Sequence, residues 1–196
     1  MDYAENVAKL RTIVKSLSEP TKQKVKDLLN SPLGKEFRHA PASTKTKYHN
    51  CFDGGLLDHS LNVWANLGKL TFTFGLTDKY STDTLNIVSI FHDLGKAGDG
   101  TNPLYIPKNS KWHNDQGILY EINEKCLPMP HAELSTLLLR KNGFDLTDDE
   151  YLAIRLHDGQ YVDYNKTFSM KEPELALLLH WADMWSTKQE KEQHSK

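Results

Sequence analysis

Histidine is the residue type that points most directly to chemistry here, because the chain has nine histidines and only two cysteines. A neutral imidazole is the commonest protein ligand for a metal ion, and a polar group buried without a partner is costly. Helical spacing of apolar residues places four histidines on, or at the ends of, different expected helices. These candidate metal ligands are His59, His92, His131 and His157.

Two aspartates occupy similarly apolar surroundings. Asp93 follows His92 directly, near the end of a helix expected over residues 84–94, and Asp183 lies inside an apolar helix expected to end at Trp185. A buried carboxylate without a partner is very unfavourable. Separate partners in the core could satisfy each of these side chains, but a shared metal centre satisfies all of them at once. We therefore predict one centre of nitrogen and oxygen donors formed by His59, His92, Asp93, His131, His157 and Asp183.

This ligand set predicts one or two divalent ions. One ion would be held by His59, His92, Asp93 and Asp183. The two remaining histidines would add a second ion, which Asp93 would bridge. Imidazole-rich ligation favours Mn, Fe, Co, Ni or Zn over Mg or Ca, with Mg as an alternative at the second position.

The elements that must position these side chains are almost all helices. Apolar spacing predicts helices over residues 7–17, 20–29, 55–67, 84–94, 131–140, 147–157 and 173–185. Pro32 should end the second of them, and Thr147 with Glu150 forms a capping box at the start of another. Helical spacing is lost over residues 97–122, where two short segments, 104–106 and 118–120, could pair as a β-hairpin. The expected fold class is all-α with one short β excursion.

Length and composition fit a single globular domain. The 196 residues are 38% hydrophobic and 26% charged, which supports one packed core and excludes wholesale disorder. We interpret residues 1–34 as an N-terminal helical segment of that domain, residues 35–187 as its main body and residues 188–196 as a polar tail.

Charge and cysteine usage exclude several classes of protein. The net charge of −2 gives no overall positive field for coating nucleic acid, although residues 1–47 carry ten basic against five acidic residues. Such a basic flank suits either an anionic ligand or a solvated helix face. Cys51 and Cys126 lack the spacing of a disulfide framework or a zinc knuckle. No apolar run approaches membrane-spanning length and the first residues lack a signal pattern, so we expect a cytoplasmic protein with no membrane partner.

The segment Phe91-His92-Asp93-Leu94-Gly95-Lys96, with His59 and Asp183, resembles the signature of the HD-domain superfamily of metal-dependent phosphohydrolases. The resemblance covers residues 35–187. It is closest in pattern to the HD domain of bacterial 3′–5′ exoribonucleases, here as a stand-alone domain. Those enzymes tend to have two consecutive histidines where this sequence has His157-Asp158. The resemblance implies an HD-type helical bundle that hydrolyses a phosphate ester.

Such a centre would activate water and would need no protein nucleophile. A divalent ion lowers the pKa of its water from about 15.7 towards roughly 7 and withdraws charge from a phosphoryl oxygen. The sequence has no Gly-x-Ser-x-Gly, His-Glu-x-x-His or Walker-type motif that would indicate another mechanism. The catalytic candidates are Asp93 and Lys96. Lys96, just beyond the helix end, can reach a substrate phosphate, as the resemblance also implies; a structural lysine at a helix terminus is the alternative.

Further basic and aromatic side chains are candidates for contacts with a nucleotide. A lysine or arginine can pair with phosphate, and an aromatic ring can stack on a base. Besides Lys96, these candidates are Arg38, Lys45, Lys47, Lys111 and Trp112. A surface hairpin explains the last two equally well. Asp58 and Asp158, next to ligand histidines, could orient imidazoles or be plain surface acids.

The sequence therefore predicts a metal-dependent phosphohydrolase whose substrate is a small nucleotide or a short nucleic acid. The alternatives within the enzyme class are a 3′–5′ exonuclease, a cyclic-nucleotide phosphodiesterase and a dNTP (for example dATP) triphosphohydrolase. A non-catalytic nucleotide-binding HD module and a nucleic-acid-binding protein that uses the basic N-terminal third are alternatives outside that class. An oligomer is compatible with the sequence.

Overall fold

The computed structural model describes residues 2–194, most of which are helical. Within this part of the chain, the strands β1 (Tyr105–Pro107) and β2 (Tyr120–Ile122) form a two-stranded antiparallel sheet in which Tyr105 lies opposite Ile122. The expected all-α class with a short hairpin is confirmed. The second strand lies two residues later than the expected segment 118–120.

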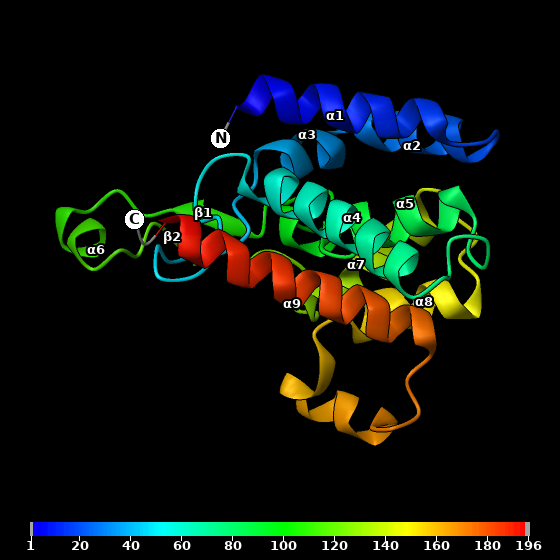
Figure 1. Cartoon of the computed structure of the whole chain (residues 1–196). Coiled ribbons are helices and arrows are strands. Elements are labelled where there is room, and N and C mark those ends of the chain that lie inside the picture. The colour runs from blue at the N-terminus through cyan, green and yellow to red at the C-terminus, as the bar shows by residue number, and fades with distance from the viewer. Residues whose placement is uncertain (1, 195–196) are drawn as a thin grey trace.

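Three N-terminal helices form one side of the molecule (Figure 1, blue). They are α1 (Tyr3–Ser16), α2 (Thr21–Asn30) and α3 (Pro32–His39). The helix α2 ends at Asn30, just before Pro32, as expected. Pro32 also occupies the first turn of a further helix, α3, which was not predicted, and there the Ser31 side chain accepts a hydrogen bond from the Gly34 backbone N–H. A proline is tolerated there because the backbone N–H groups in the first turn of a helix have no hydrogen-bond acceptor within the helix, so none is lost. This turn of the chain sends α3 back towards the body of the protein.

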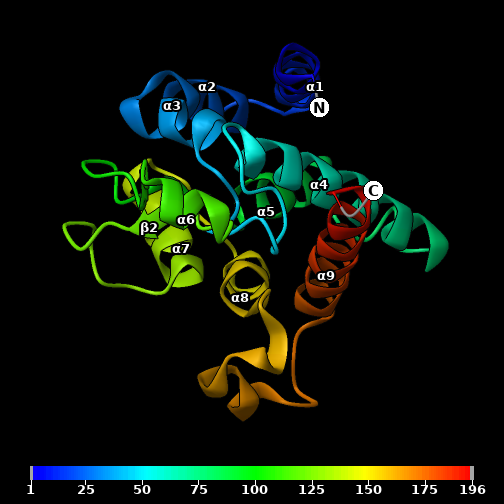
Figure 2. The ribbon, with the colours of Figure 1, turned by 90° about the vertical axis from the view of Figure 1, so that its left-hand side faces the viewer.

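The helix α4 (Gly55–Thr73) lies at the centre of the fold. It packs against α5 (Thr82–Phe91), α9 (Glu174–His194), α1 and α3, and Figures 1 and 2 both show α9 beside it. Its side chains Leu56, Leu57 and Val63 are completely buried. Because α4 is covered on several sides, a polar side chain on it must find a partner inside the core.

The second half of the chain completes the bundle. It contains α6 (Lys111–Asp115), α7 (His131–Lys141), α8 (Asp148–Leu156) and the short 3₁₀ helices η1 (Leu94–Ala97), η2 (Gly159–Tyr161) and η3 (Asp163–Phe168). The helix α8 packs against α7 and α9, and η1 packs against α7. The predicted capping box of Thr147 and Glu150 is present at the start of α8. The segment with η2 and η3 forms a loop that projects from the bundle between α8 and α9 (Figure 2, orange).

The last helix is longer than expected. The sequence predicted an end at Trp185 and a polar tail over residues 188–196, but α9 continues to His194; residues 195 and 196 lie outside the described residues. The physical reason is a buried stripe at intervals of four residues, formed by Ala182, Ser186 and Glu190, each at most 1% exposed. No helix in the described part of the chain combines the length and the apolar character needed to cross a membrane.

Candidate metal centre

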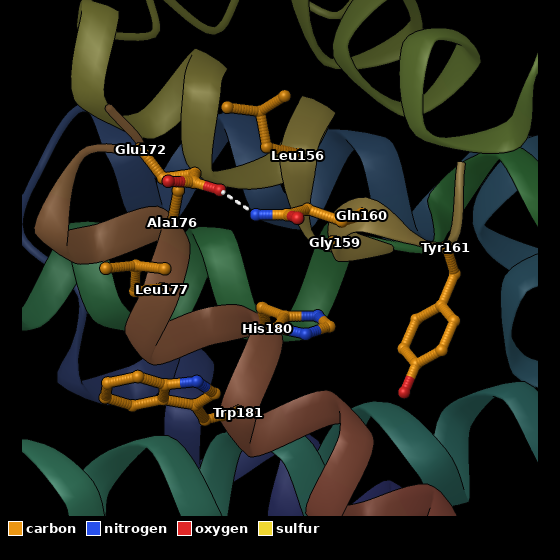
Figure 3. Close-up of a pocket in the computed structure, with 9 residues that line it drawn as sticks. All are labelled: Leu156, Gly159, Gln160, Tyr161, Glu172, Ala176, Leu177, His180 and Trp181. Atoms are coloured by element: carbon orange, nitrogen blue, oxygen red, sulfur yellow. Dashed lines mark hydrogen bonds between the residues drawn. The ribbon is translucent and has the colours of Figure 1, made fainter. Parts of the chain in front are cut away.

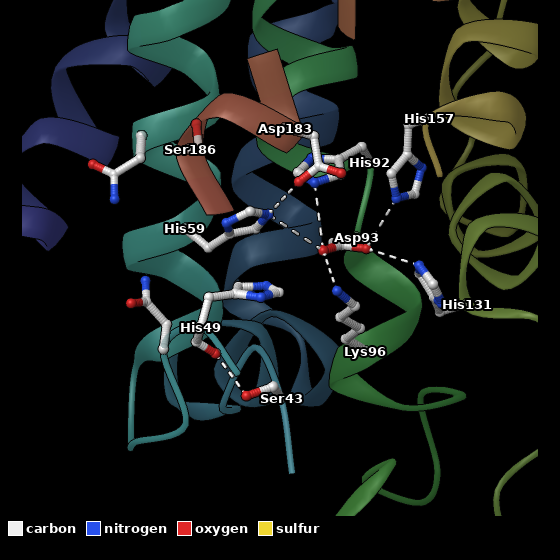
Figure 4. Close-up of polar contacts among 12 residues, drawn as sticks. Ser43, His49, His59, His92, Asp93, Lys96, His131, His157, Asp183 and Ser186 are labelled. Atoms are coloured by element: carbon white, nitrogen blue, oxygen red, sulfur yellow. Dashed lines mark hydrogen bonds and ion pairs between the residues drawn. The ribbon is translucent and has the colours of Figure 1, made fainter. Parts of the chain in front are cut away.

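The six side chains predicted as metal ligands converge on one buried cluster (Figure 4). They come from α4, from the ends of α5 and α8, from the start of α7 and from α9. Four of them are at most 1% exposed, namely His59, His92, Asp93 and His157. Helix ends are suited to this convergence, because side chains there can leave the helix and meet those of a neighbouring element.

Asp93 lies at the centre of the cluster and divides it into two halves. Its Oδ2 atom is 3.6 Å from His59 Nε2 and 3.4 Å from His92 Nε2. Its Oδ1 atom is 3.2 Å from His131 Nε2 and 3.3 Å from His157 Nε2. Each oxygen of one carboxylate therefore faces two imidazole nitrogens. A bridging carboxylate between two ions would have this arrangement.

Each half of the cluster also has a carboxylate of its own. Asp183 Oδ1 lies 3.0 Å from His59 Nε2 in the first half. In the second half, Asp158 Oδ2 lies 3.3 Å from His131 Nε2, and its Oδ1 lies 3.8 Å from His157 Nε2. The sequence indicated Asp158 only as an orienting or surface acid. The structure adds Asp158 to the candidate ligands. Each half then contains two imidazoles and one carboxylate that the other half does not share, Asp183 in the first and Asp158 in the second.

Two of the histidines have their protonation pattern set by the helix that carries them. His92 Nδ1 is 2.8 Å from the backbone carbonyl of Ser89, and His157 Nδ1 is 2.7 Å from that of Ile154. A carbonyl oxygen can only accept, so both Nδ1 atoms donate. Whenever one of these rings is neutral, its Nε2 atom is a lone-pair acceptor that faces an oxygen of Asp93, which is also an acceptor. Two facing acceptors repel each other unless a proton or a cation lies between them.

His59 is oriented by a residue from the far end of α9. Its Nδ1 lies 3.1 Å and 3.2 Å from the two carboxylate oxygens of Glu190, which also accepts a hydrogen bond from Asn62 at 2.8 Å. A carboxylate behind an imidazole fixes the ring and raises its basicity, as is usual for histidines that bind metals. Sequence reasoning missed Glu190 because it lies in the segment taken for a polar tail. The available signal was that Glu190 follows Asp183 by seven residues, which is two turns of a helix, so both side chains lie on the same face of α9.

The donor atoms of the cluster fit a cation by a second criterion. Buried polar atoms in folded proteins are nearly always hydrogen-bonded. Five atoms that face the centre of this cluster are buried without a well-aligned hydrogen bond: His59 Nε2, His92 Nε2, His131 Nε2 and both carboxylate oxygens of Asp93. Their close contacts are ion pairs within the cluster, such as those of Lys96 with Asp93 and of Asp183 with His59. These atoms are nitrogen and oxygen donors of the kind that divalent transition metals bind. The cluster could therefore hold a metal ion.

Charges within the cluster shift the pKa values of its acids. Burial raises the pKa of Asp93, but the charge of Lys96 leads the effects that together outweigh burial and hold the pKa of this carboxyl well below its usual range. Lys96 Nζ lies 2.7 Å from Asp93 Oδ2, and the charge of Asp93 raises the pKa of this ammonium against the effect of burial. The Lys96–Asp93 pair is therefore ionised. Burial raises the pKa of Tyr105, at the start of β1, which also lies near the charges of Lys96 and Asp93.

The imidazoles respond differently to the same surroundings. Burial lowers the pKa of His59, but the charge of Glu190 leads the effects of Glu190 and Asp183 that together outweigh burial, and the pKa rises to about 10. Burial likewise lowers the pKa of His157, and the charge of Asp158 leads the effects that raise it to about 9. For His92, burial dominates and the pKa falls. In the absence of an ion, His59 and His157 therefore carry protons at neutral pH, whereas His92 presents a bare lone pair.

His49 is a further histidine beside the cluster. Its ring centroid lies 4.7 Å from that of His59, and its Nε2 atom is buried without a hydrogen-bond partner. Burial, followed by the charge of His59, lowers the pKa of His49 to about 2. A neutral imidazole therefore covers the cluster on the side of the segment that precedes α4 (Figure 4).

Of the residues predicted to contact substrate, Lys96 lies in the cluster. Arg38, Lys111 and Trp112 lie elsewhere. Arg38 donates from Nη1 to the backbone carbonyl of Leu29 at 2.6 Å and lines a cleft between α1, α2 and α3. Lys111 and Trp112 belong to α6, which lies at the tip of the hairpin away from the bundle (Figure 1), and Trp112 is 64% exposed.

The two remaining predicted cations lie on the segment between α3 and α4. Lys45 forms a β-bridge with Ile118 of the hairpin segment. The Lys47 Nζ atom lies 5.4 Å from the centroid of the neighbouring Tyr48 ring. Among the described contacts, neither side chain pairs with a member of the cluster.

Comparisons of the chain with models of protein families, with curated proteins and with solved structures found no match. The geometry and chemistry of the cluster are therefore the basis for a functional assignment.

Proposed function

We propose that this protein is a metal-dependent phosphohydrolase of the HD type, which hydrolyses a phosphoester or phosphoanhydride bond of a nucleotide. The observation that carries the proposal is the position of Asp93, whose two oxygens each face two imidazole nitrogens while Lys96 lies 2.7 Å from one of them. Paired imidazoles and shared carboxylates suit transition-metal ions, and a neighbouring ammonium suits the negative charge of a phosphate.

The two halves of the cluster would each hold one ion. The first half consists of His59, His92 and Asp183, the second consists of His131, His157 and Asp158, and Asp93 belongs to both. A divalent ion held there would lower the pKa of a bound water molecule and polarise a phosphoryl oxygen. The backbone carbonyls of Ser89 and Ile154 accept hydrogen bonds from Nδ1 of His92 and His157. The Nε2 atom of each ring, which faces the centre of the cluster, is thereby left to bind an ion.

The substrate would approach the partly exposed edge of the cluster. The side chains of Lys96, Asp183, His131 and Asp158 are between 13% and 28% exposed, whereas the other ligands are buried. Lys96 would donate a hydrogen bond to a phosphoryl oxygen and stabilise the charge that develops there. Its ion pair with Asp93 holds the ammonium in place before substrate arrives, which lowers the entropy lost on binding.

A matrix of metals and substrates tests the proposal. The protein would be freed of metal, then supplied with Mn²⁺, Co²⁺, Zn²⁺ or Mg²⁺ and offered nucleoside mono-, di- and triphosphates, cyclic nucleotides and a short oligonucleotide. We expect at least one metal to support hydrolysis. The product assigns the reaction: inorganic triphosphate indicates a dNTP triphosphohydrolase, and mononucleotides from an oligonucleotide indicate an exonuclease.

Asp78→Asn, at an exposed position, is a suitable control for Asp93→Asn in this matrix. Hydrolysis by the wild type and Asp78→Asn but not by Asp93→Asn would support the proposal. Metal binding without hydrolysis of any substrate would overturn it in favour of a non-catalytic nucleotide-binding module.

A further inference from the structure

A cavity of about 370 Å³ lies beside the metal cluster, between the end of α8, the loop that follows it and α9 (Figure 3). This volume is within the range of about 300–1,000 Å³ that is typical of small-molecule sites. Its walls include Gly159, Gln160, Tyr161, Glu172, His180 and Trp181. None of these residues belongs to the cluster described above.

The cavity and the cluster share the same two elements. The side chain of His157 faces Asp93, while its backbone carbonyl lies 2.7 Å from His180 Nδ1 in the cavity wall. His180 precedes the cluster residue Asp183 by one turn of α9, and Asp158 directly precedes the cavity residue Gly159. A ligand with its phosphate at the exposed edge of the cluster would therefore have the cavity next to it.

The polar atoms of the cavity wall include several acceptors. His180 Nδ1 must donate to the carbonyl of His157, so the neutral ring offers Nε2 as an acceptor. Glu172 contributes a carboxylate, which accepts a hydrogen bond of 3.0 Å from Gln160 Nε2 (Figure 3). A ligand that carries N–H donors suits this wall better than one that presents only carbonyl oxygens.

Aromatic rings flank the opening of the cavity. The Trp181 side chain is 41% exposed and that of Tyr161 is 84% exposed. The ring centroids of Tyr161 and His180 are 6.4 Å apart. Exposed aromatic rings beside a pocket provide surfaces on which a planar heterocycle can stack.

We infer that this cavity binds the heterocyclic base of the nucleotide whose phosphate is held at the metal cluster, with a preference for bases that carry an exocyclic amino group. This inference rests on the proposed function for the position of the phosphate. The base stacks against Trp181 and Tyr161, and its amino group donates to His180 Nε2 or to Glu172.

Gly159 keeps the cavity open for this role. Its φ of +62° is in the left-handed region, and a Cβ atom at this position would lie 2.3 Å from His180 Cε1. An alanine here would therefore push the imidazole out of its position and strain the backbone. Gly159→Ala is a variant that disturbs the cavity without removing any proposed metal ligand.

Calorimetry with nucleosides tests the inference apart from catalysis. Metal-free protein in chelator would be titrated with adenosine and cytidine, which have amino groups, and with their deaminated counterparts inosine and uridine. We expect at least one amino-bearing nucleoside to bind, and its counterpart to bind about tenfold or more weakly. We also expect Trp181→Ala and Gly159→Ala to weaken this binding about tenfold, since stacking on an aromatic ring contributes substantially.

Two further variants complete the test. Trp185→Ala removes an exposed tryptophan one turn further along α9 that does not line this cavity, and it should leave binding unchanged. Tyr161→Ala, at a highly exposed position, should weaken binding without endangering the fold. Equal binding of each amino-bearing nucleoside and its counterpart, no binding of any nucleoside, or full binding by Trp181→Ala, Gly159→Ala and Tyr161→Ala would overturn the inference.

The two proposals can fail separately. Selective nucleoside binding by a protein that hydrolyses no phosphate ester would support the base site and contradict the proposed function. Metal-dependent hydrolysis by a protein that shows no such selectivity would support the proposed function and contradict the base site.

Discussion

Glu190 lies 3.1 Å from Nδ1 of His59, although 131 positions separate the two residues in the sequence. The contact joins the last turns of α9 to the second turn of α4, and both side chains are buried. It gives α9 two functions in the cluster: Asp183 faces His59 Nε2, and Glu190 holds the opposite nitrogen of the same ring. A carboxylate in this position tunes a metal ligand that it does not replace.

Glu190→Gln should weaken metal binding while the helical fold persists. The amide keeps the shape of the side chain but loses the charge that raises the basicity of His59, and loss of such a partner typically lowers metal affinity about 10–100-fold. Calorimetric titration of metal-free protein with Mn²⁺ or Co²⁺ measures the change. Glu192→Gln, at an exposed position on the same helix, is the matched control, and equal affinities for both variants would contradict the assigned role.

His157→Ala should remove one bound ion and leave the other. His157 and His131 face one oxygen of Asp93, and His59 and His92 face the other, so the loss of one imidazole affects mainly its own half. Elemental analysis of protein loaded with Co²⁺ should give one equivalent fewer than for the wild type. His113→Ala, on α6, is the control. A variant that keeps the wild-type metal content would show that the second half does not bind an ion.

Metal binding should strengthen as pH rises from 6 towards 9. In the metal-free protein the pKa values of His59 and His157 are raised to about 10 and about 9, and an ion must displace these protons. Calorimetry at pH 7 in buffers of different ionisation enthalpy should therefore show that protons are released on binding. Proton uptake, or an affinity independent of pH, would contradict this protonation state.

The same pKa values predict opposite trends for stability without and with metal. A histidine whose pKa is raised on folding contributes stability that is fully present below its unfolded pKa of about 6.5. This contribution from His59 and His157 is lost as pH rises towards 9–10. The increase in Tm caused by a saturating ion should therefore grow over the same range. Thermal denaturation with chelator or with Mn²⁺ measures both trends, and a metal-induced increase that shrinks with pH would contradict them.

Gly95→Ala should destabilise the protein and disturb the second half of the cluster. A Cβ atom at Gly95 would lie 2.3 Å from the backbone oxygen of His131, so η1 and α7 would have to separate, at a cost of about 1–3 kcal/mol. Gly68→Ala is the control, because a Cβ atom there meets nothing within 4 Å and alanine favours a helix. Urea denaturation in chelator compares the two, and equal stabilities would contradict the close packing of η1 on α7.

The side chains of the cluster could be identified from the sequence because each is a polar side chain in or at the end of an apolar helix, where burial without a partner is unfavourable. His59, His92 and Asp183 stand out in this way without any knowledge of how the helices pack. The halves of the cluster could not be predicted, because they depend on which oxygen of Asp93 faces which helix. Asp158 was ambiguous for the same reason, since an acid at a helix end is as often solvated as buried.

The errors in the predicted fold have local causes. Pro32 follows a run of helical spacing and correctly indicated the end of α2 at Asn30. With Ser31 as an N-cap, Pro32 also fits the first turn of a helix, so the segment after it forms α3, which was not predicted. Arg38 consequently belongs to α3, where its side chain donates to the backbone carbonyl of Leu29 and lines the cleft with α1 and α2. The polar composition after Trp185 concealed a buried stripe, which Ser186 and Glu190 continue at helical spacing.

Restoration of hydrolysis by metal is the most direct test of the central claim. Metal-free protein would be titrated with Mn²⁺ while product release from its best nucleotide substrate is followed. We predict no hydrolysis without metal, recovery that saturates at two ions per chain, and a loss of about a thousandfold or more in Asp93→Asn, since metal ions contribute several kcal/mol to such reactions. Full activity in chelator, or recovery of Asp93→Asn to the wild-type rate, would contradict the claim.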